Sequence, residues 1–185
     1  TDDPFQNAPV NLPHQVLGSP RPFSEYLSGV STVQARTIDD VKNFLVTQCL
    51  YKSDIRRFGC LDHWQTPEEF EKSREGDCED SALWAWRKLH EMGIQAHFVV
   101  GLCVHDDKKY ISGHAWVMFF VDGKWRIFES MAKSLDKMVL SLGKARGIYY
   151  PMYSVDRDTK TFFYSGVRLA TQRAHIDKMQ IKAWG

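Results

Sequence analysis

Three stretches of the chain carry apolar residues at helical spacing, over residues 37–50, 66–74 and 78–92. The first two begin at Thr37 and Thr66, each followed three positions later by an acidic residue, which is the spacing of a capping box. The third follows directly on a polar loop and presents one apolar stripe. The pattern therefore predicts three helices in the first half of the chain.

The period changes to that of strands after residue 94. Residues 95–105, 111–121 and 124–129 are rich in aromatic and β-branched side chains, which favour strands. The pair Asp122-Gly123 separates the last two stretches and is typical of a two-residue type I′ hairpin. These features predict an antiparallel meander, and the fold class is α+β, with a central helix packed on an antiparallel sheet.

The remainder of the chain gives weaker signals. Residues 134–145 favour a short amphipathic helix, and residues 148–155 with 161–169 favour a second hairpin. The tail beyond Ala170 is expected to add a closing strand or helix. Residues 1–35 are expected to form an extended N-terminal arm because they contain five prolines and little periodicity, leaving residues 36–185 as a single domain.

Composition narrows the classes of function. The chain has 185 residues, 43% of them hydrophobic, and a formal net charge of +1, which suits one globular domain with its own core. The charge balance gives no reason to expect nucleic acid as a partner. No apolar run reaches the ~18 residues of a membrane span. We expect a monomer, and the sequence leaves its compartment open.

Cys78 is the most informative of the four cysteines. It lies in the charged run Gly76-Asp77-Cys78-Glu79-Asp80 at the start of the third predicted helix, whereas Cys49 and Cys103 lie in apolar patterns and are expected to be buried. A helix N-terminus favours thiolate over thiol, and the thiolate is the nucleophile. The neighbouring carboxylates act in the opposite direction, so activation requires a histidine or a neutralising cation.

The register of the predicted hairpin indicates which histidine could act as the base for Cys78. If Asp122 and Gly123 are the two loop residues, His114 and Glu129 are diagonal neighbours on the face that also carries Trp116. We expect the apolar stripe of the Cys78 helix to cover that same face. The prediction is a triad in which Cys78 attacks, His114 takes its proton and Glu129 orients the imidazole.

Two kinds of metal site can be considered from the sequence. Carboxylates beside Cys78 could form part of an oxygen-rich Ca²⁺ site, although capping of the helix accounts for them equally well. Zinc is not favoured, because the half-site Cys60-x-x-His63 has no second pair at a convincing distance and Cys103-x-His105 lies along one strand.

Residues 63–69 (HWQTPEE), 76–80 (GDCED) and 113–116 (GHAW), in this order, resemble the bacterial transglutaminase-like cysteine proteinases. The resemblance covers about residues 62–130 and implies a papain/transglutaminase-like fold. It also implies that Cys78 is the nucleophile and His114 the base, that Asp77 and Glu79 help to bind Ca²⁺, and that Trp64 lies beside the oxyanion site. The chain departs from the family pattern at Glu129, where the family usually has Asp.

The leading hypothesis is a cysteine hydrolase that cleaves a peptide or amide bond of a protein or peptide substrate through a thioester. The chemistry requires no cofactor, and Ca²⁺ is the one ion that the sequence suggests. The alternatives are amide-forming acyl transfer, amidase action on cell-wall peptides, and an inactive module that binds a protein partner through the aromatic-rich segment from Tyr149 to Tyr164.

Overall fold

The computed structural model describes residues 9–10, 19–59 and 62–182. Its main sheet has the strand order β1-β9-β8-β4-β5-β6-β7, and β10 pairs with the free end of β5. All neighbours in this sheet are antiparallel except β10 and β5. The strands are β1 Pro9–Val10, β4 Ala96–His105, β5 Tyr110–Val121, β6 Lys124–Phe128, β7 Val139–Ser141, β8 Tyr149–Val155, β9 Thr161–Phe163 and β10 Gln180–Lys182.

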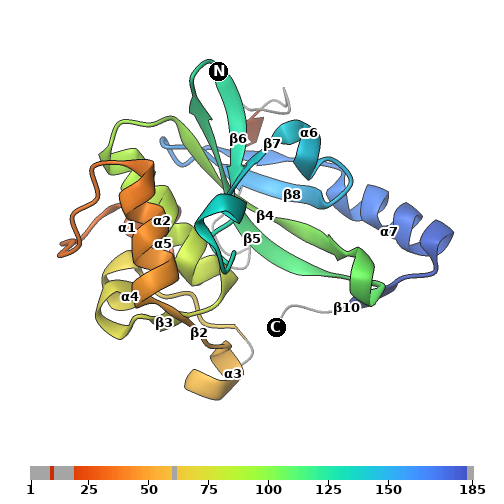
Figure 1. The fold of residues 1–185 in the computed structure, drawn as a ribbon, viewed down its shortest axis with the longest axis horizontal. Helices are drawn as coiled ribbons and strands as arrows, with labels where there is room; N and C mark the ends of the chain where they lie inside the picture. Colours follow the sequence, from red (N-terminus) through yellow and green to blue (C-terminus); the bar gives the residue numbers. More distant parts are fainter. Residues whose placement is uncertain (1–8, 11–18, 60–61, 183–185) are drawn as a thin grey trace.

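Helices lie on both sides of this sheet (Figure 1). The helices near the start of the chain gather on one side, and α6 and α7 lie on the other. A small parallel pair, β2 Leu50–Tyr51 and β3 Glu75–Gly76, leads into α5. The helices are α1 Phe23–Leu27, α2 Ile38–Gln48, α3 Asp54–Arg57, α4 Pro67–Ser73, α5 Cys78–Glu91, α6 Leu142–Ala145 and α7 Gly166–Asp177.

The predicted helix starts and the predicted hairpin are confirmed. Thr37 and Thr66 each form a capping box, at α2 and α4. Asp122 and Gly123 have φ of 52° and 70°, the left-handed values that a type I′ turn needs at both positions. The β5–β6 register follows the prediction from Val121 opposite Lys124 to Val117 opposite Phe128. The mixed fold with an antiparallel sheet is therefore as predicted.

The face of the sheet that α5 covers was predicted wrongly. Apolar side chains of α5 share a core with Ala115, Val117 and Phe119, the odd-numbered residues of β5. Trp116 and Met118 belong to a separate cluster on the other face, which includes Ala145 of α6. The Asp122-Gly123 turn determines which residues of β5 and β6 share a face. Which of the two faces α5 packs on depends on the tertiary structure.

Two segments differ from their predicted secondary structure. Only Leu142–Ala145 of the helix predicted over residues 134–145 is α-helical, because Val139–Ser141 pairs with the open edge of β6. In the predicted hairpin, β9 ends at Phe163 and α7 begins at Gly166. The tail supplies the rest of α7 and then β10, so both forms of the expected closing element are present.

The N-terminal segment enters the domain from Ser19 onwards. Phe23 and Tyr26 of α1 are buried in the main core. Residues 1–8 and 11–18 lie outside the described residues, so the predicted extended arm stays a prediction there. Among the described residues, no helix has the length and apolar character needed to cross a bilayer.

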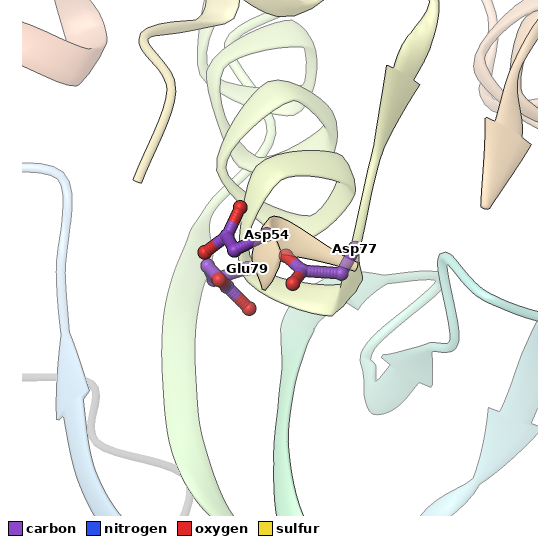
Figure 2. Close-up of side chains that lie close together, drawn as sticks. All are labelled: Asp54, Asp77 and Glu79. Atoms are coloured by element: carbon purple, nitrogen blue, oxygen red, sulfur yellow. The ribbon is translucent and has the colours of Figure 1, made fainter. Parts of the chain in front are cut away.

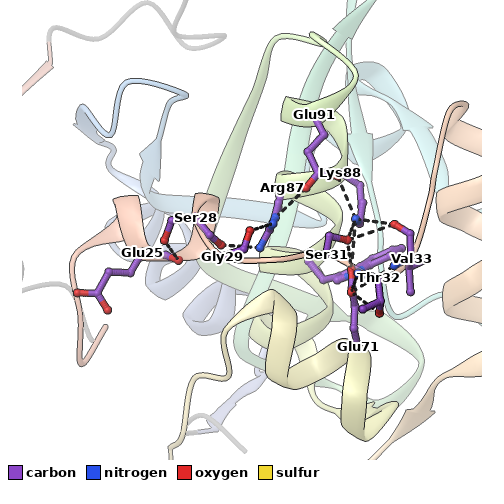
Figure 3. Close-up of polar contacts among 11 residues, drawn as sticks. Glu25, Ser28, Gly29, Ser31, Thr32, Val33, Glu71, Arg87, Lys88 and Glu91 are labelled. Carbon is purple, nitrogen blue, oxygen red and sulfur yellow. Dashed lines mark hydrogen bonds and ion pairs between the residues drawn. The ribbon is translucent and has the colours of Figure 1, made fainter.

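A buried polar network holds this segment against the helices (Figure 3). The carboxylate of Glu71 in α4 accepts hydrogen bonds from Ser31 (2.5 Å), from the backbone N–H of Thr32 (2.8 Å) and from Trp84 (3.0 Å). Lys88 of α5 lies 3.2 Å from the same carboxylate, and its side chain is fully buried. Burial alone would raise the pKa of Glu71, but these donors and the Lys88 charge lower it to about 2.

Candidate active site

The start of α5 places Cys78 against the middle of the sheet. Asp77 is the N-cap of the helix, and Cys78 is its first residue. The preceding Gly76 is required by close packing, because a Cβ there would lie 2.5 Å from an Asp80 carboxylate oxygen. Asp80 is buried and accepts from the Gln65 backbone N–H at 2.8 Å and from the Gln65 side-chain amide at 2.6 Å. Gly76 and Asp80, which flank Cys78, therefore fix the position of the cysteine.

The sulfur of Cys78 interacts with β5 and with its own helix. The backbone N–H of Ala115, the residue after His114 in β5, acts to lower the pKa of the thiol. The thiol donates to Glu79 Oε2 at 3.2 Å. Burial raises the pKa of Cys78 well above its usual value, and the negative charges of Glu79 and Asp77 raise it further. The helix terminus does not outweigh these effects, so this arrangement by itself holds the thiol in its protonated form.

His114 and Glu129 form the predicted pair. Nε2 of His114 lies 2.7 Å from Glu129 Oε2, and both side chains are largely buried. Glu129 follows the end of β6, outside the strand ladder, and its other oxygen accepts from the Met131 backbone N–H at 3.0 Å. Burial opposes ionisation of Glu129, but His114 and the hydrogen bonds to the carboxylate lower its pKa. The diagonal contact inferred from the hairpin register is confirmed.

Cys78 at the start of α5 and His114 in β5 share no direct hydrogen bond. The thiol donates to Glu79, and the imidazole bonds to Glu129. Because Nε2 faces Glu129, Nδ1 is the ring nitrogen left to act as a base. The catalytic roles of Cys78, His114 and Glu129 therefore stay predictions that this geometry permits.

Tyr149 is a further member of the site that the sequence did not single out. Its hydroxyl donates to Glu129 Oε2 at 2.8 Å, the same oxygen that His114 contacts. Its ring centroid is 6.3 Å from that of His114. The sequence placed Tyr149 only in an aromatic-rich segment, since a contact between residues 129 and 149 leaves no local pattern. Tyr149 helps to hold the carboxylate in a fixed position.

Trp64 lies in the core. Its side chain is 4% exposed and is surrounded by Phe23, Tyr26 and Phe98. Its indole N–H donates to Asp62 at 2.7 Å. The proposed place of Trp64 beside the oxyanion site stays a prediction, and in this structure its donor is already engaged.

Three acidic side chains gather at the N-terminal end of α5 (Figure 2). Asp54, Asp77 and Glu79 each offer a carboxylate oxygen, and these oxygens all lie within 4.8 Å of one another. Two oxygens on opposite sides of a Ca²⁺ ion, each bound at about 2.4 Å, would be about 4.8 Å apart. Asp77 and Glu79 were predicted, whereas Asp54, from the short helix α3, was not.

The three carboxylates of this cluster are not balanced by a positive charge in the described part of the chain. Burial raises the pKa of Asp54 to about 6, and burial together with Asp77 raises that of Glu79 well above its usual value. One oxygen of Asp54 and one of Asp77 are buried without a hydrogen-bond partner in the described part of the chain. Hard oxygen donors with uncompensated charge suit Ca²⁺, so the residues present fit this ion.

Two of the other cysteines can be placed in the structure. Cys103 is buried as predicted and Cys49 is half-buried. Burial raises the pKa of each of these two thiols to about 12. Cys60, one member of the disfavoured zinc half-site, lies outside the described residues. Within those residues, the three carboxylates at α5 form the one candidate metal cluster.

Comparisons with known proteins bear on the family and the fold of the chain. The family model of the transglutaminase-like superfamily matches residues 22–130, more than half of the chain. The chain belongs to the transglutaminase-like superfamily. A search of curated proteins found no match. The superfamily match contains Cys78, His114 and Glu129, and it begins just before α1.

Solved structures of Legionella pneumophila LapG share the fold. The calcium-bound form is 20% identical with a TM-score of 0.51, covering 73% of this chain and 77% of that one. A second LapG structure is 21% identical with a TM-score of 0.51, covering 86% and 80%. An EGTA-treated form is 22% identical with a TM-score of 0.50, covering 67% and 63%. At this level of identity the likeness concerns the fold.

Proposed function

We propose that this protein is a cysteine hydrolase that cleaves a peptide or amide bond in a protein or peptide substrate. The observation that carries the proposal is the 2.7 Å hydrogen bond from His114 to Glu129, beside the strand N–H that contacts the Cys78 sulfur. A buried histidine oriented by a carboxylate, next to a helix-terminal thiol, is the arrangement of an activated nucleophile. The superfamily match supports the same class of chemistry.

The reaction would proceed in two halves. Nδ1 of His114 takes the thiol proton, and the thiolate adds to the carbonyl carbon to form a tetrahedral oxyanion. Backbone N–H groups at the start of α5 would stabilise that oxyanion. Its collapse expels the amine, which receives the proton from His114, and leaves a thioester on Cys78. Water, deprotonated by His114, then releases the acid. An incoming amine in place of water would instead give amide transfer.

Asp54, Asp77 and Glu79 would hold Ca²⁺ beside the nucleophile. The bound ion would supply positive charge where the buried carboxylates now raise the pKa of Cys78. With its charge balanced by the ion, Glu79 would oppose thiolate formation less, and His114 would take the thiol proton. The solved structures of LapG include a calcium-bound and an EGTA-treated form, and this likeness supports the assignment.

Thiol reactivity tests the proposal without knowledge of the natural substrate. In the folded protein with Ca²⁺, iodoacetamide should alkylate Cys78 faster than buried Cys103, and His114→Ala should slow this labelling by about 10²-fold, the scale of a lost general base. Glu129→Gln, which keeps the shape of the side chain, should slow it less. Slow and equal labelling of both thiols would reject an activated nucleophile and favour the inactive binding module.

Hydrolysis is tested on mixed protein substrates. The active protein and its Cys78→Ala variant are incubated with lysate and envelope fractions, and new protein termini and released ammonia are measured. New termini that require Cys78 support peptide-bond hydrolysis. Ammonia release with amine incorporation and no new termini would contradict hydrolysis and establish acyl transfer. No difference between the two proteins would remove the enzyme assignment for these substrates.

A further inference from the structure

A pocket of about 550 Å³ lies on the face of the sheet opposite α5. Its volume is within the range of sites that take small molecules, about 300–1,000 Å³. Trp116, Tyr149, Tyr150 and Tyr164 give it an aromatic lining, to which Leu142 adds an aliphatic side chain. Such a lining suits a ligand with an apolar body. The segment from Tyr149 to Tyr164, noted in the sequence for its aromatic content, contributes three of these residues.

One residue that lines the pocket has a buried polar atom without a partner among the described residues. Trp116 is fully buried, and its indole N–H makes no hydrogen bond with the described residues. Because this indole lines the pocket, its N–H resonance can report on a molecule bound there.

One arginine and one helix N-terminus lie at the same pocket. Arg146 lines it and has no ion pair with any described residue. Ser165 and Gly166, at the N-terminus of the twelve-residue helix α7, also line it. The first turn of α7 contains no acidic residue, and the Ser165 side chain makes no capping hydrogen bond. A helix start without these partners carries unpaired N–H groups and favours an anion.

The position of the α7 start is fixed by close packing. A Cβ on Gly166 would lie 2.0 Å from the Pro151 carbonyl oxygen of β8, so the helix begins in direct contact with the strand that supplies Tyr149 and Tyr150. The anion-favouring end of the pocket is therefore held by backbone contacts rather than by a mobile side chain.

We propose that this pocket binds a small organic carboxylate with an apolar, aromatic or aliphatic, body. The carboxylate would meet Arg146 and the α7 N-terminus, and the apolar body would lie among the tyrosines. The same chemistry occurs in a free apolar acid and in the C-terminal apolar residue of a peptide. The proposal goes beyond the hydrolase assignment, because binding here does not involve Cys78.

Binding is measured on the Cys78→Ala protein, so the outcome is independent of catalysis. The probes are 4-phenylbutyrate with its neutral amide, and acetyl-Ala-Phe with a free or an amidated C-terminus. Calorimetry should show saturable binding of at least one free carboxylate and much weaker binding of its amide. The Trp116 indole N–H resonance, assigned with Trp116→Phe, should shift with that probe.

Variants then locate the bound molecule. Arg146→Gln should weaken binding by about tenfold or more, the value of one charge-assisted hydrogen bond. Gly143→Phe should block the pocket without disturbing the fold, because the nearest atom to an added Cβ there is the Ser141 hydroxyl at 4.0 Å. Arg157→Gln, which removes an exposed arginine from the β8–β9 turn, is the matched control and should bind normally.

Several results would overturn the proposal. Absence of saturable binding by both carboxylates overturns it. Equal binding of acids and amides, or normal binding by both Arg146→Gln and Gly143→Phe, also overturns it. Binding of the free acid alone or of the peptide alone upholds the site and identifies the source of the carboxylate.

Discussion

Two buried acidic groups in this protein have opposite electrostatic environments. Glu71 is surrounded by donors and by the Lys88 ammonium, and these partners lower its pKa to about 2 despite burial. Asp54, Asp77 and Glu79 face one another, and burial with mutual repulsion raises their pKa values. Lys88 balances the charge of Glu71 within the fold, so we assign Glu71 a structural role. No positive charge among the described residues balances the three carboxylates beside Cys78, and a bound cation there can change the reactivity of the thiol.

The largest predicted loss of stability comes from removing one partner of the buried Glu71–Lys88 pair. Lys88→Met leaves the Glu71 carboxylate buried without its cation and should cost about 3–5 kcal/mol in the free energy of unfolding. Urea titration followed by circular dichroism measures this loss. The double variant Glu71→Gln, Lys88→Met should recover part of it, because no charge is left unpaired. Lys72→Met, at the exposed Glu68–Lys72 pair, is the control and should show no measurable change. An unaltered Lys88→Met midpoint would contradict the structural role.

The second prediction concerns Ca²⁺ binding to Asp54, Asp77 and Glu79. Ca²⁺ at a hundred times its dissociation constant should stabilise the protein by about 2.7 kcal/mol. Differential scanning calorimetry with Ca²⁺ or a chelator measures the shift. Asp54→Asn should abolish most of it, and Asp158→Asn, in the exposed β8–β9 turn, should leave it unchanged. An equal shift in both variants would show that Ca²⁺ acts elsewhere.

The two sites should also respond to pH in opposite directions. The folded pKa of Asp54 is raised to about 6, so its folded state is favoured at low pH, and stability should fall by about 1–3 kcal/mol as pH rises from about 4 to 7 without Ca²⁺. The folded pKa of Glu71 is lowered, so its contribution is full above about 4.5 and is lost as pH falls towards 2. Thermal unfolding across pH, compared with Asp54→Asn and Glu71→Gln, separates the two. If the contributions of Asp54 and Glu71 to stability changed with pH in the same direction, the proposed difference between the two sites would be wrong.

The smallest predicted effect is a gain in stability. In chelator at pH 7, Asp54→Asn should raise the free energy of unfolding by about 1 kcal/mol, because it removes one repelling charge and keeps the shape of the side chain. Chemical denaturation of the two proteins measures the difference. A destabilised variant would mean that the hydrogen bond from the His63 backbone to Asp54 outweighs the repulsion.

Much of the local structure could be predicted from single residues. The capping boxes at Thr37 and Thr66, the turn at Asp122-Gly123 and the resulting contact of His114 with Glu129 follow from short-range geometry. The edge pairing of Val139–Ser141 could not be predicted, since its strand partner is chosen by which edge of the sheet is open.

The sequence by itself determined the position of Cys78 at a helix start and the residues that share a sheet face with His114, because caps and register depend on neighbours a few positions apart. Only the tertiary structure decided that α5 packs on the odd-numbered face of β5, and that Asp54 joins Asp77 and Glu79. It also decided that Tyr149 reaches Glu129. These contacts join segments about 20 or more residues apart, and burying the apolar faces of the whole chain together selects them.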